Sequence, residues 1–283
     1  KWQNITFTTG LSKNLMQNVH FDFMGRAKTW LTAGAIAAVV CIGFLATRGL
    51  SKSIDFTGGR NFKVQFENEV EPEQIRELIA DKFGDANVSV IAVGTDGKTV
   101  RISTNYRIQE EGNNVDSEIE AYLYEALKPV LTQDISLETF IDRDNYTGGS
   151  IISSQKVGPS IAEDITTSAI WSVVLALLAI GLYILIRFRN IAYSIGSIVA
   201  LAFDTLIILG MYSIFWGILP FSLEIDQTFI GAVLTAIGYS INDKVVIFDR
   251  VREFFGLYPK RDKMQLFNDS LNSTLARTIN TSV

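Results

Sequence analysis

The sequence predicts a multi-pass α-helical membrane protein with one α+β domain inserted after the first membrane span. Two observations carry this prediction. Hydrophobic residues make up 48% of the 283 residues and are concentrated in long runs without charge. The net charge of −5 is also divided unevenly, because residues 52–155 carry 10 basic and 19 acidic side chains, a net of −9, and the remainder carries +4. An acidic, mixed-composition block therefore interrupts a basic and strongly apolar chain.

Four apolar runs are long enough to cross a bilayer, which takes about 20 residues of helix. Asp204 interrupts the third run, and Asn242 and Asp243 lie toward the end of the fourth. A fifth run begins near residue 271 and continues to residue 283. A signal peptide for the first run and buried soluble helices for the others are weaker alternatives, because four runs share this length. The predicted spans are residues 29–47, 166–186, 191–219 and 228–251, with residues 271–283 as the start of a fifth.

The distribution of Lys and Arg predicts the orientation. Basic residues precede the first span, fill the 187–190 turn and follow the fourth span, whereas residues 220–227 contain two acids and no base. We expect residues 1–28 to form a cytoplasmic connector and residues 252–270 a cytoplasmic loop, with residues 48–160 on the outer side. Because the chain starts at Lys1 and stops inside the fifth run, we interpret it as a piece of a longer polypeptide.

The order of the elements predicted in the acidic block is typical of a ferredoxin-like βαββαβ domain. Residues 61–67 alternate apolar and polar side chains, which is typical of a half-buried strand, and Pro72 opens an amphipathic helix that ends at Phe83. The remaining predicted elements are strands over 88–93 and 99–103, a helix over 116–131 and a last strand over 137–141.

Several function classes are excluded or disfavoured by composition. Neither part of the chain concentrates basic residues on a face for nucleic acid. A single cysteine, Cys41, and a single histidine, His20, cannot build a disulfide or a Cys/His metal site. We expect no cofactor, and the sequence has no phosphate-binding G-x-x-x-x-G-K-[ST] loop. An intramembrane enzyme lacks a supporting motif.

Four short motifs are hard to explain as ordinary membrane helix. They are D-F-T-G-G at 55–59, V-G-P-S-I at 157–161, G-Y-S-I-N-D at 238–243 and R-T-I-N-T-S at 277–282. In this order they resemble the SecF half of the SecD/SecF protein-export membrane proteins, in the RND transporter superfamily. The motif residues of the first two are Asp55, Phe56, Thr57, Gly58, Gly59, Gly158 and Pro159.

The resemblance implies a role in Sec-dependent export across the bacterial cytoplasmic membrane, driven by the proton-motive force. It also implies a SecD half (fused or separate), the SecYEG translocon, the translocating preprotein and the lipid bilayer as partners. A proton-driven RND exporter of small molecules or lipids is the alternative. Against it, a single small outer domain has little surface with which to enclose a drug-binding pocket. A subunit that only stabilises the translocon is a second alternative, and the choice between protons and sodium ions stays open.

The charged residues inside the predicted spans are the candidate transport site. A carboxylate near the bilayer centre costs roughly 2.5–3.5 kcal/mol, so it should face the bundle interior or water. Asp243 and Arg277 lie at similar depths from the same side, which permits a pair between neighbouring helices, and the resemblance assigns both to proton transport. Asp204 is a further candidate for the relay, with Asn242 and Gly238 in supporting roles. A static ion pair that joins helices is the competing interpretation.

Overall fold

The computed structural model describes residues 20–84, 88–94, 96–110, 113–131, 135–144, 149–219 and 222–282. Most of the predicted connector, residues 1–19, therefore lies outside the described residues. The chain divides into two compact units. One contains the chain up to Thr47 with Val173–Met211 and Gly231–Val283, and the other contains Arg48–Ser172 with Tyr212–Ile230. Each unit is described by itself.

Four described helices are long and apolar enough to cross a membrane, which confirms the predicted multi-pass architecture. The first, second and fourth extend beyond the predicted spans, because a helix continues past the apolar run until a residue ends it, whereas the third ends at Phe215, before the predicted end at residue 219. Arg189 has a positive φ of 52° between the second and third helices, and the Asn190 side chain accepts a hydrogen bond from the Ala192 amide. The helices are α2 (Ala27–Thr47), α7 (Pro159–Phe188), α8 (Ile191–Phe215) and α9 (Gln227–Leu257).

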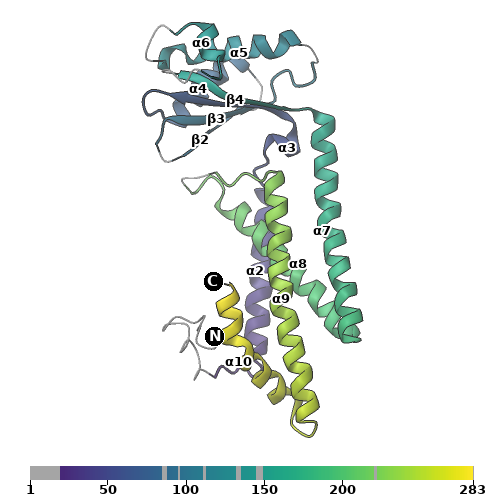
Figure 1. Cartoon of the computed structure of the whole chain (residues 1–283). Helices are drawn as coiled ribbons and strands as arrows, with labels where there is room; N and C mark the ends of the chain where they lie inside the picture. Colours follow the sequence, from purple (N-terminus) through teal and green to yellow (C-terminus); the bar gives the residue numbers. More distant parts are fainter. Residues whose placement is uncertain are drawn as a thin grey trace, which may run out of the picture. The chain divides into compact units, whose positions relative to one another are not determined.

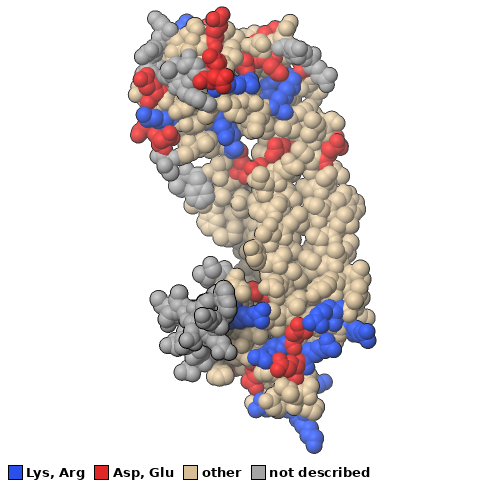
Figure 2. Space-filling model, viewed as in Figure 1, with Lys and Arg blue, Asp and Glu red and all other residues tan. Residues whose placement is uncertain are grey.

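The membrane helices bury few side chains and contact each other at small residues. Along α2 and α7 the large apolar side chains are mostly exposed. A Cβ atom added to Gly210 would lie 2.3 Å from the Cys41 sulfur, and one added to Gly181 would lie 2.4 Å from Ile198 Cδ1. Small residues let helix backbones approach closely, which is a usual device in membrane bundles. The visible face of these helices has a broad band without Lys, Arg, Asp or Glu (Figure 2).

Helices α9 and α10 (Lys263–Ser282) form a hairpin that shortens the predicted 252–270 loop. The Asp262 carboxylate accepts a hydrogen bond from the Gln265 amide and so begins α10 eight residues before the predicted apolar run. The rings of Phe255 and Phe267 meet with centroids 5.3 Å apart. The prediction missed these helical turns because their composition is polar, and hydropathy alone does not detect amphipathic helix.

The second unit contains a four-stranded antiparallel sheet with the order β2-β3-β1-β4. This is the strand order of the predicted ferredoxin-like domain, and helices α4, α5 and α6 lie over one face of the sheet (Figure 1). Strand β1 is central, and its pairing with β4 shifts register between Lys63 and Val64. The elements are α3 (Ile54–Thr57), β1 (Gly59–Phe66), α4 (Pro72–Phe83), β2 (Val88–Ala92), β3 (Thr99–Thr104), α5 (Asn113–Leu127), α6 (Leu137–Ile141) and β4 (Gly149–Val157).

The predicted last strand over 137–141 is wrong, since these residues form the short helix α6. Ser136 caps this helix by accepting a hydrogen bond from the Thr139 amide, and Glu138 lies in the first turn, where a carboxylate stabilises a helix. The last strand is β4 instead. The predicted helix over 116–131 is α5 followed by a 3₁₀ turn over Lys128–Val130, because Pro129 lacks the amide hydrogen that a helix requires.

One hydrophobic cluster between the sheet and these helices forms the core of the domain. It draws on every strand except β2, whose Val88 and Val90 are partly buried against it. Its fully buried members alternate along β1 and β3, as a half-buried sheet requires. Its buried members are Phe62, Val64, Phe66, Ile75, Ile79, Phe83, Val100, Ile102, Val115, Ile119, Leu123, Ala126, Leu127, Phe140 and Ile151.

Arg48 binds the C-terminal end of α8 from the start of the second unit. Its guanidinium donates hydrogen bonds of 2.9 Å to the carbonyl groups of Ile214 and Trp216, and lies 5.0 Å from the centre of the Trp216 ring. The last carbonyl groups of a helix have no partner within it and attract cations. Arg48 is thus explained by helix capping, although it runs against the distribution of basic residues that predicts the orientation.

Candidate functional site

The D-F-T-G-G motif forms one helical turn that leads directly into β1. Ser53 begins α3 by accepting a hydrogen bond from the Asp55 amide, and Gly58 ends it with a φ of 70°. Gly59 has a φ of 152°, and a Cβ atom there would lie 2.9 Å from the Thr104 carbonyl oxygen. Both positions therefore require glycine, one for its backbone conformation and the other for conformation and space.

The first two motifs meet at the point where the domain's chain enters and leaves. Gly59 pairs with Val157 at the end of the β1–β4 ladder. A Cβ atom on Gly58 would lie 3.3 Å from the Cα atom of Pro159, the first residue of α7. Gly158 itself has open space around its Cα atom. The paired glycines thus let the start of β1 and the start of α7 lie in backbone contact.

Asp55 of the same motif binds the start of α9. Its carboxylate accepts a hydrogen bond of 3.0 Å from the amide of Gln227, the first residue of that helix. Asp226 adds a second cap by accepting a hydrogen bond from the Phe229 amide. Carboxylates at a helix N-terminus satisfy free amides and interact well with the helix dipole. Side chains of Phe56 and Thr57 belong to the same turn but not to this cap.

Asp204 on α8 is bound by two donors on one face of α9. Its Oδ2 atom lies 2.6 Å from the Lys244 ammonium and 2.5 Å from the Ser240 hydroxyl. Ser240 and Lys244 are four residues apart and also contact each other. The Asp204 side chain retains 38% of its exposure and that of Lys244 retains 20%. The carboxylate predicted to be costly in the membrane thus has a charged partner and a hydroxyl partner.

Asp243, the next candidate on α9, is directed to α10. Its Oδ1 atom accepts a hydrogen bond of 2.8 Å from the Thr281 hydroxyl. Arg277 lies one turn earlier on α10 and lines a cavity of about 440 Å³ together with Asp249, Arg250 and Glu253. The pairing of Asp243 with Arg277 that their depths permit stays a prediction.

The supporting residues Asn242 and Gly238 are both exposed, and a Cβ atom on Gly238 would meet nothing within 4 Å. Sequence reasoning missed Lys244 and Ser240 as partners of Asp204. A signal existed, because Lys244 is the base nearest the middle of the span that follows the span of Asp204, and charged side chains within membrane spans are expected to pair with one another. Across the residues that the structure describes, no group of three His, Cys, Asp or Glu side chains is placed to hold a metal ion.

Comparison with known proteins places these features in a family. A family model described as protein export membrane protein SecD/SecF, C-terminal, matches residues 140–283, and a model described as the SecD/SecF GG motif matches residues 43–70. The second range contains the D-F-T-G-G turn. The two models together span the inserted domain's ends, all later membrane helices and α10.

Curated relatives match along most of the chain. Protein translocase subunit SecF of Rhodothermus marinus is 35% identical over 268 residues, which are 95% of this chain and 80% of that protein. SecF of Haemophilus influenzae is 32% identical, over 93% of this chain and 71% of that protein. Protein translocase subunit SecDF of Thermus thermophilus is 33% identical over 93% of this chain, which spans 32% of its length.

Two solved structures of SecDF share the fold. The crystal structure of the Thermus protein, described as a translocon-associated membrane protein, matches 95% of this chain with a TM-score of 0.73 and 29% identity. A second structure, of SecDF in a super-membrane-facing form, matches 94% with a TM-score of 0.57 and 30% identity. Together with the motifs, the sheet order and the four membrane helices, these matches show that the chain belongs to the SecD/SecF family of protein-export membrane proteins, as a SecF-like part of the Sec export machinery.

Proposed function

We propose that this SecF-like chain uses the proton-motive force to promote polypeptide translocation, as a subunit that resembles a secondary transporter. The observation that carries the proposal is the bonding of two carboxylates in the membrane helices to donors on neighbouring helices. Asp204 joins α8 to α9, and Asp243 joins α9 to α10. Protonation of either carboxylate would remove the charge that holds its donor, and so would change the contact between two helices.

Proton transfer in this proposal uses Asp243 with Arg277, and Asp204 with Lys244. Removing a carboxylate from water raises its pKa, whereas a nearby cation lowers it, so the approach and withdrawal of a cation can load and release a proton. Arg277 lies one helical turn from Thr281, so a modest shift of α10 along α9 would exchange the hydroxyl partner of Asp243 for a guanidinium. Asp204 already has its cation 2.6 Å away.

The partners that fit this role follow from the family. We propose a SecD half, fused or separate, the SecYEG translocon and the translocating preprotein, in the bacterial cytoplasmic membrane. The basic residues near the ends of α7 and α9 favour a cytoplasmic location for those ends, with residues 48–160 in the periplasm.

The proposal is tested by reconstituting the full-length protein and its SecD part with the translocon in vesicles. Preprotein translocation is measured with and without a proton gradient, and with a sodium gradient as a separate arm. Asp243→Asn keeps an oxygen that can accept the Thr281 hydrogen bond but cannot ionise, so insertion should persist while the gradient-dependent part of translocation disappears. Asp249→Asn is the matched control, since Asp249 is a half-exposed carboxylate on the same helix.

Full gradient-dependent translocation by the Asp243→Asn variant would contradict the proposal. Stimulation by a sodium gradient alone would replace the proton with sodium as the coupling ion. Equal activity of a variant in which Asp204 and Lys244 are both replaced by Leu would assign that pair a purely structural role.

A further inference from the structure

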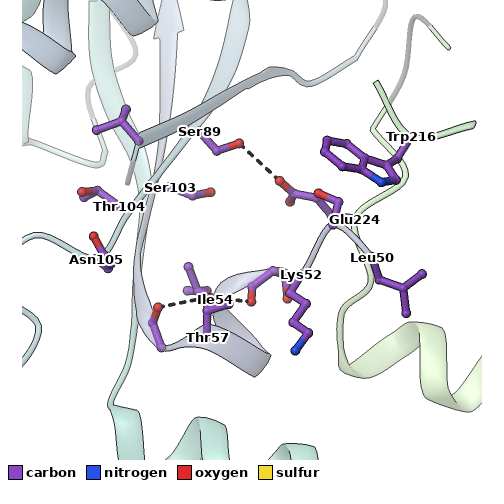
Figure 3. A pocket seen from close by; sticks show the side chains of 14 residues that line it. Leu50, Lys52, Ile54, Thr57, Ser89, Ser103, Thr104, Asn105, Trp216 and Glu224 are labelled. Atoms are coloured by element: carbon purple, nitrogen blue, oxygen red, sulfur yellow. Dashed lines mark hydrogen bonds between the residues drawn. The ribbon is translucent and has the colours of Figure 1, made fainter. Parts of the chain in front are cut away.

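The connection between α8 and α9 is bound to the sheet of the inserted domain through Glu224. One oxygen of its carboxylate lies 2.6 Å from an Arg101 guanidinium nitrogen on β3. The other accepts a hydrogen bond of 3.4 Å from the Ser89 hydroxyl on β2. Figure 3 shows Ser89 and Glu224 directed toward each other across a cavity of about 530 Å³. Only 10% of the Glu224 side chain is exposed.

Backbone pairing holds the next residue of the same connection. The Ile225 amide donates to the Ser51 carbonyl over 2.8 Å, and the Ser53 amide donates to the Ile225 carbonyl over 2.9 Å. Lys52 and Ile225 thereby form a parallel bridge, and the Ile225 side chain is buried. The connection is thus paired with the residues that lead into the D-F-T-G-G turn.

The two fixed points are followed directly by α9. The Asp55 carboxylate binds the Gln227 amide, so residues 224–227, which lead into α9 and begin it, are attached three times to the domain and to the residues that enter it. The same helix carries Ser240, Asp243 and Lys244 further along. If the sheet moves at Glu224, it therefore pulls on the N-terminal end of α9, the helix that carries these charged residues.

The environment of Glu224 indicates that this residue fixes the arrangement of two elements and adds little to the stability of the fold. Burial raises its pKa, and the nearby Asp226 charge raises it further, while Arg101 and the Ser89 hydroxyl act in the opposite direction. The other charged group lining the cavity is Lys52. Because the net pKa shift is upward, the ionised Glu224 is less favourable here than in water. Buried ion pairs of this kind can fix one arrangement of two elements without adding stability.

We propose that Glu224 is a positioning residue that clamps the start of α9 to the β2–β3 edge of the inserted domain. Through this clamp, movement of the domain is coupled to proton transfer at the charged residues of α9. The clamp is defined by Glu224, Arg101 and Ser89. Its coupling role rests on the proposed proton-driven function, whereas the attachment itself does not.

The test uses the full-length protein with its SecD part. Glu224→Ala removes the clamp, and Glu224→Gln keeps the side-chain volume without the charge in case the first variant folds poorly. Glu110→Ala is the matched control, because it removes an ion pair with Arg107 on the surface of the same domain. Hydrogen exchange of the Ser53 and Ile225 amides reports attachment, and vesicle assays report proton uptake and translocation.

We expect about tenfold or faster exchange of those two amides in Glu224→Ala, since a hydrogen bond to a charged group typically contributes this much to a local equilibrium. Gradient-driven translocation should fall while proton uptake persists, and the control should match the unchanged protein. A charge-exchanged variant, Arg101→Glu with Glu224→Arg, should recover part of the translocation.

Unchanged exchange of the Ser53 and Ile225 amides would overturn the clamp. Faster exchange with undiminished translocation would overturn its coupling role. If translocation by the unchanged protein does not respond to an ion gradient, the proposed function fails, and the exchange measurement still decides whether the clamp exists.

Discussion

Gly59 is the residue of the D-F-T-G-G turn that should tolerate substitution least. Its φ of 152° lies in a region that residues with a side chain rarely adopt. A Cβ atom would also lie 2.8 Å from Ile54 Cγ2 and 2.9 Å from the Thr104 carbonyl oxygen. Ile54 can move by side-chain rotation, but the Thr104 oxygen belongs to β3 and cannot move without disturbing the sheet.

The magnitude follows from these two terms. An unfavourable backbone conformation costs about 1–3 kcal/mol, and forcing extra atoms into a packed core costs about 1–3 kcal/mol more. Gly84 provides a matched control, because its φ is also positive, at 58°, but a Cβ atom there would meet nothing within 4 Å. We therefore expect Gly59→Ala to destabilise the domain by about 1–3 kcal/mol more than Gly84→Ala.

Native-state hydrogen exchange of the full-length protein measures this difference. The reporting amides are those of the buried residues Phe62, Val64 and Ile102, which exchange when the sheet opens. The expected difference corresponds to exchange about 5- to 150-fold faster in Gly59→Ala than in Gly84→Ala. Adding Ile54→Ala should recover only part of the loss, since the clash with the Thr104 oxygen remains. Equal exchange in the two glycine variants would refute the steric argument.

Three further predictions concern other contacts. Gly210→Ala should lower the thermal stability of the purified protein by placing a Cβ atom 2.3 Å from the Cys41 sulfur, and Cys41→Gly in the same chain should restore most of it. Burial raises the pKa of Glu120 above its ordinary value of 4.5, against the opposing effect of Arg143, so its contribution to stability is present at pH values below 4.5 and is lost as the pH rises through the raised pKa. Glu120→Gln should flatten that part of the pH profile in thermal unfolding. Arg48→Gln should speed hydrogen exchange in the last turn of α8 several-fold, because two carbonyl groups lose their donor.

The membrane helices and most of the inserted domain were predictable because each has a local signal. An uncharged run of about 20 residues identifies a span, and Pro72 with a regular apolar face identifies α4 at both ends. The segment over 137–141 has no such signal, because five apolar and polar residues suit a strand or a helical turn equally well. The helical conformation of this segment depends on the Ser136 cap and on burial of Phe140 in a core that forms only in the folded domain.

The candidate site was predictable in its residues but not in its pairs. Because placing a carboxylate in the membrane interior costs free energy, Asp204 and Asp243 are identified as residues that need partners. Adjacent residues on a helix diverge by about 100°, so Asp243 and Lys244 are directed to different neighbours. Which neighbour each side chain meets depends on the packing of α8 and α10 around α9, and hydropathy contains no information about that packing. Glu224 was missed for a related reason, since its partner Arg101 is 123 positions away.

The hairpin of α9 and α10 determines the height at which Thr281 meets Asp243. Helix α9 has 31 residues, a length of about 46 Å, so it exceeds the roughly 30 Å of hydrocarbon. Near the turn, the Phe255–Phe267 ring contact joins the two helices, and an Arg261–Asp269 ion pair of 3.2 Å joins the turn to α10; both are contacts of the kind made in water. Inside lipid, apolar side chains gain little by meeting each other, so these contacts set the alignment of the two helices. One residue inserted into α10 after Asp269 would rotate the rest of that helix by about 100° and advance it by about 1.5 Å, which would turn Thr281 away from Asp243.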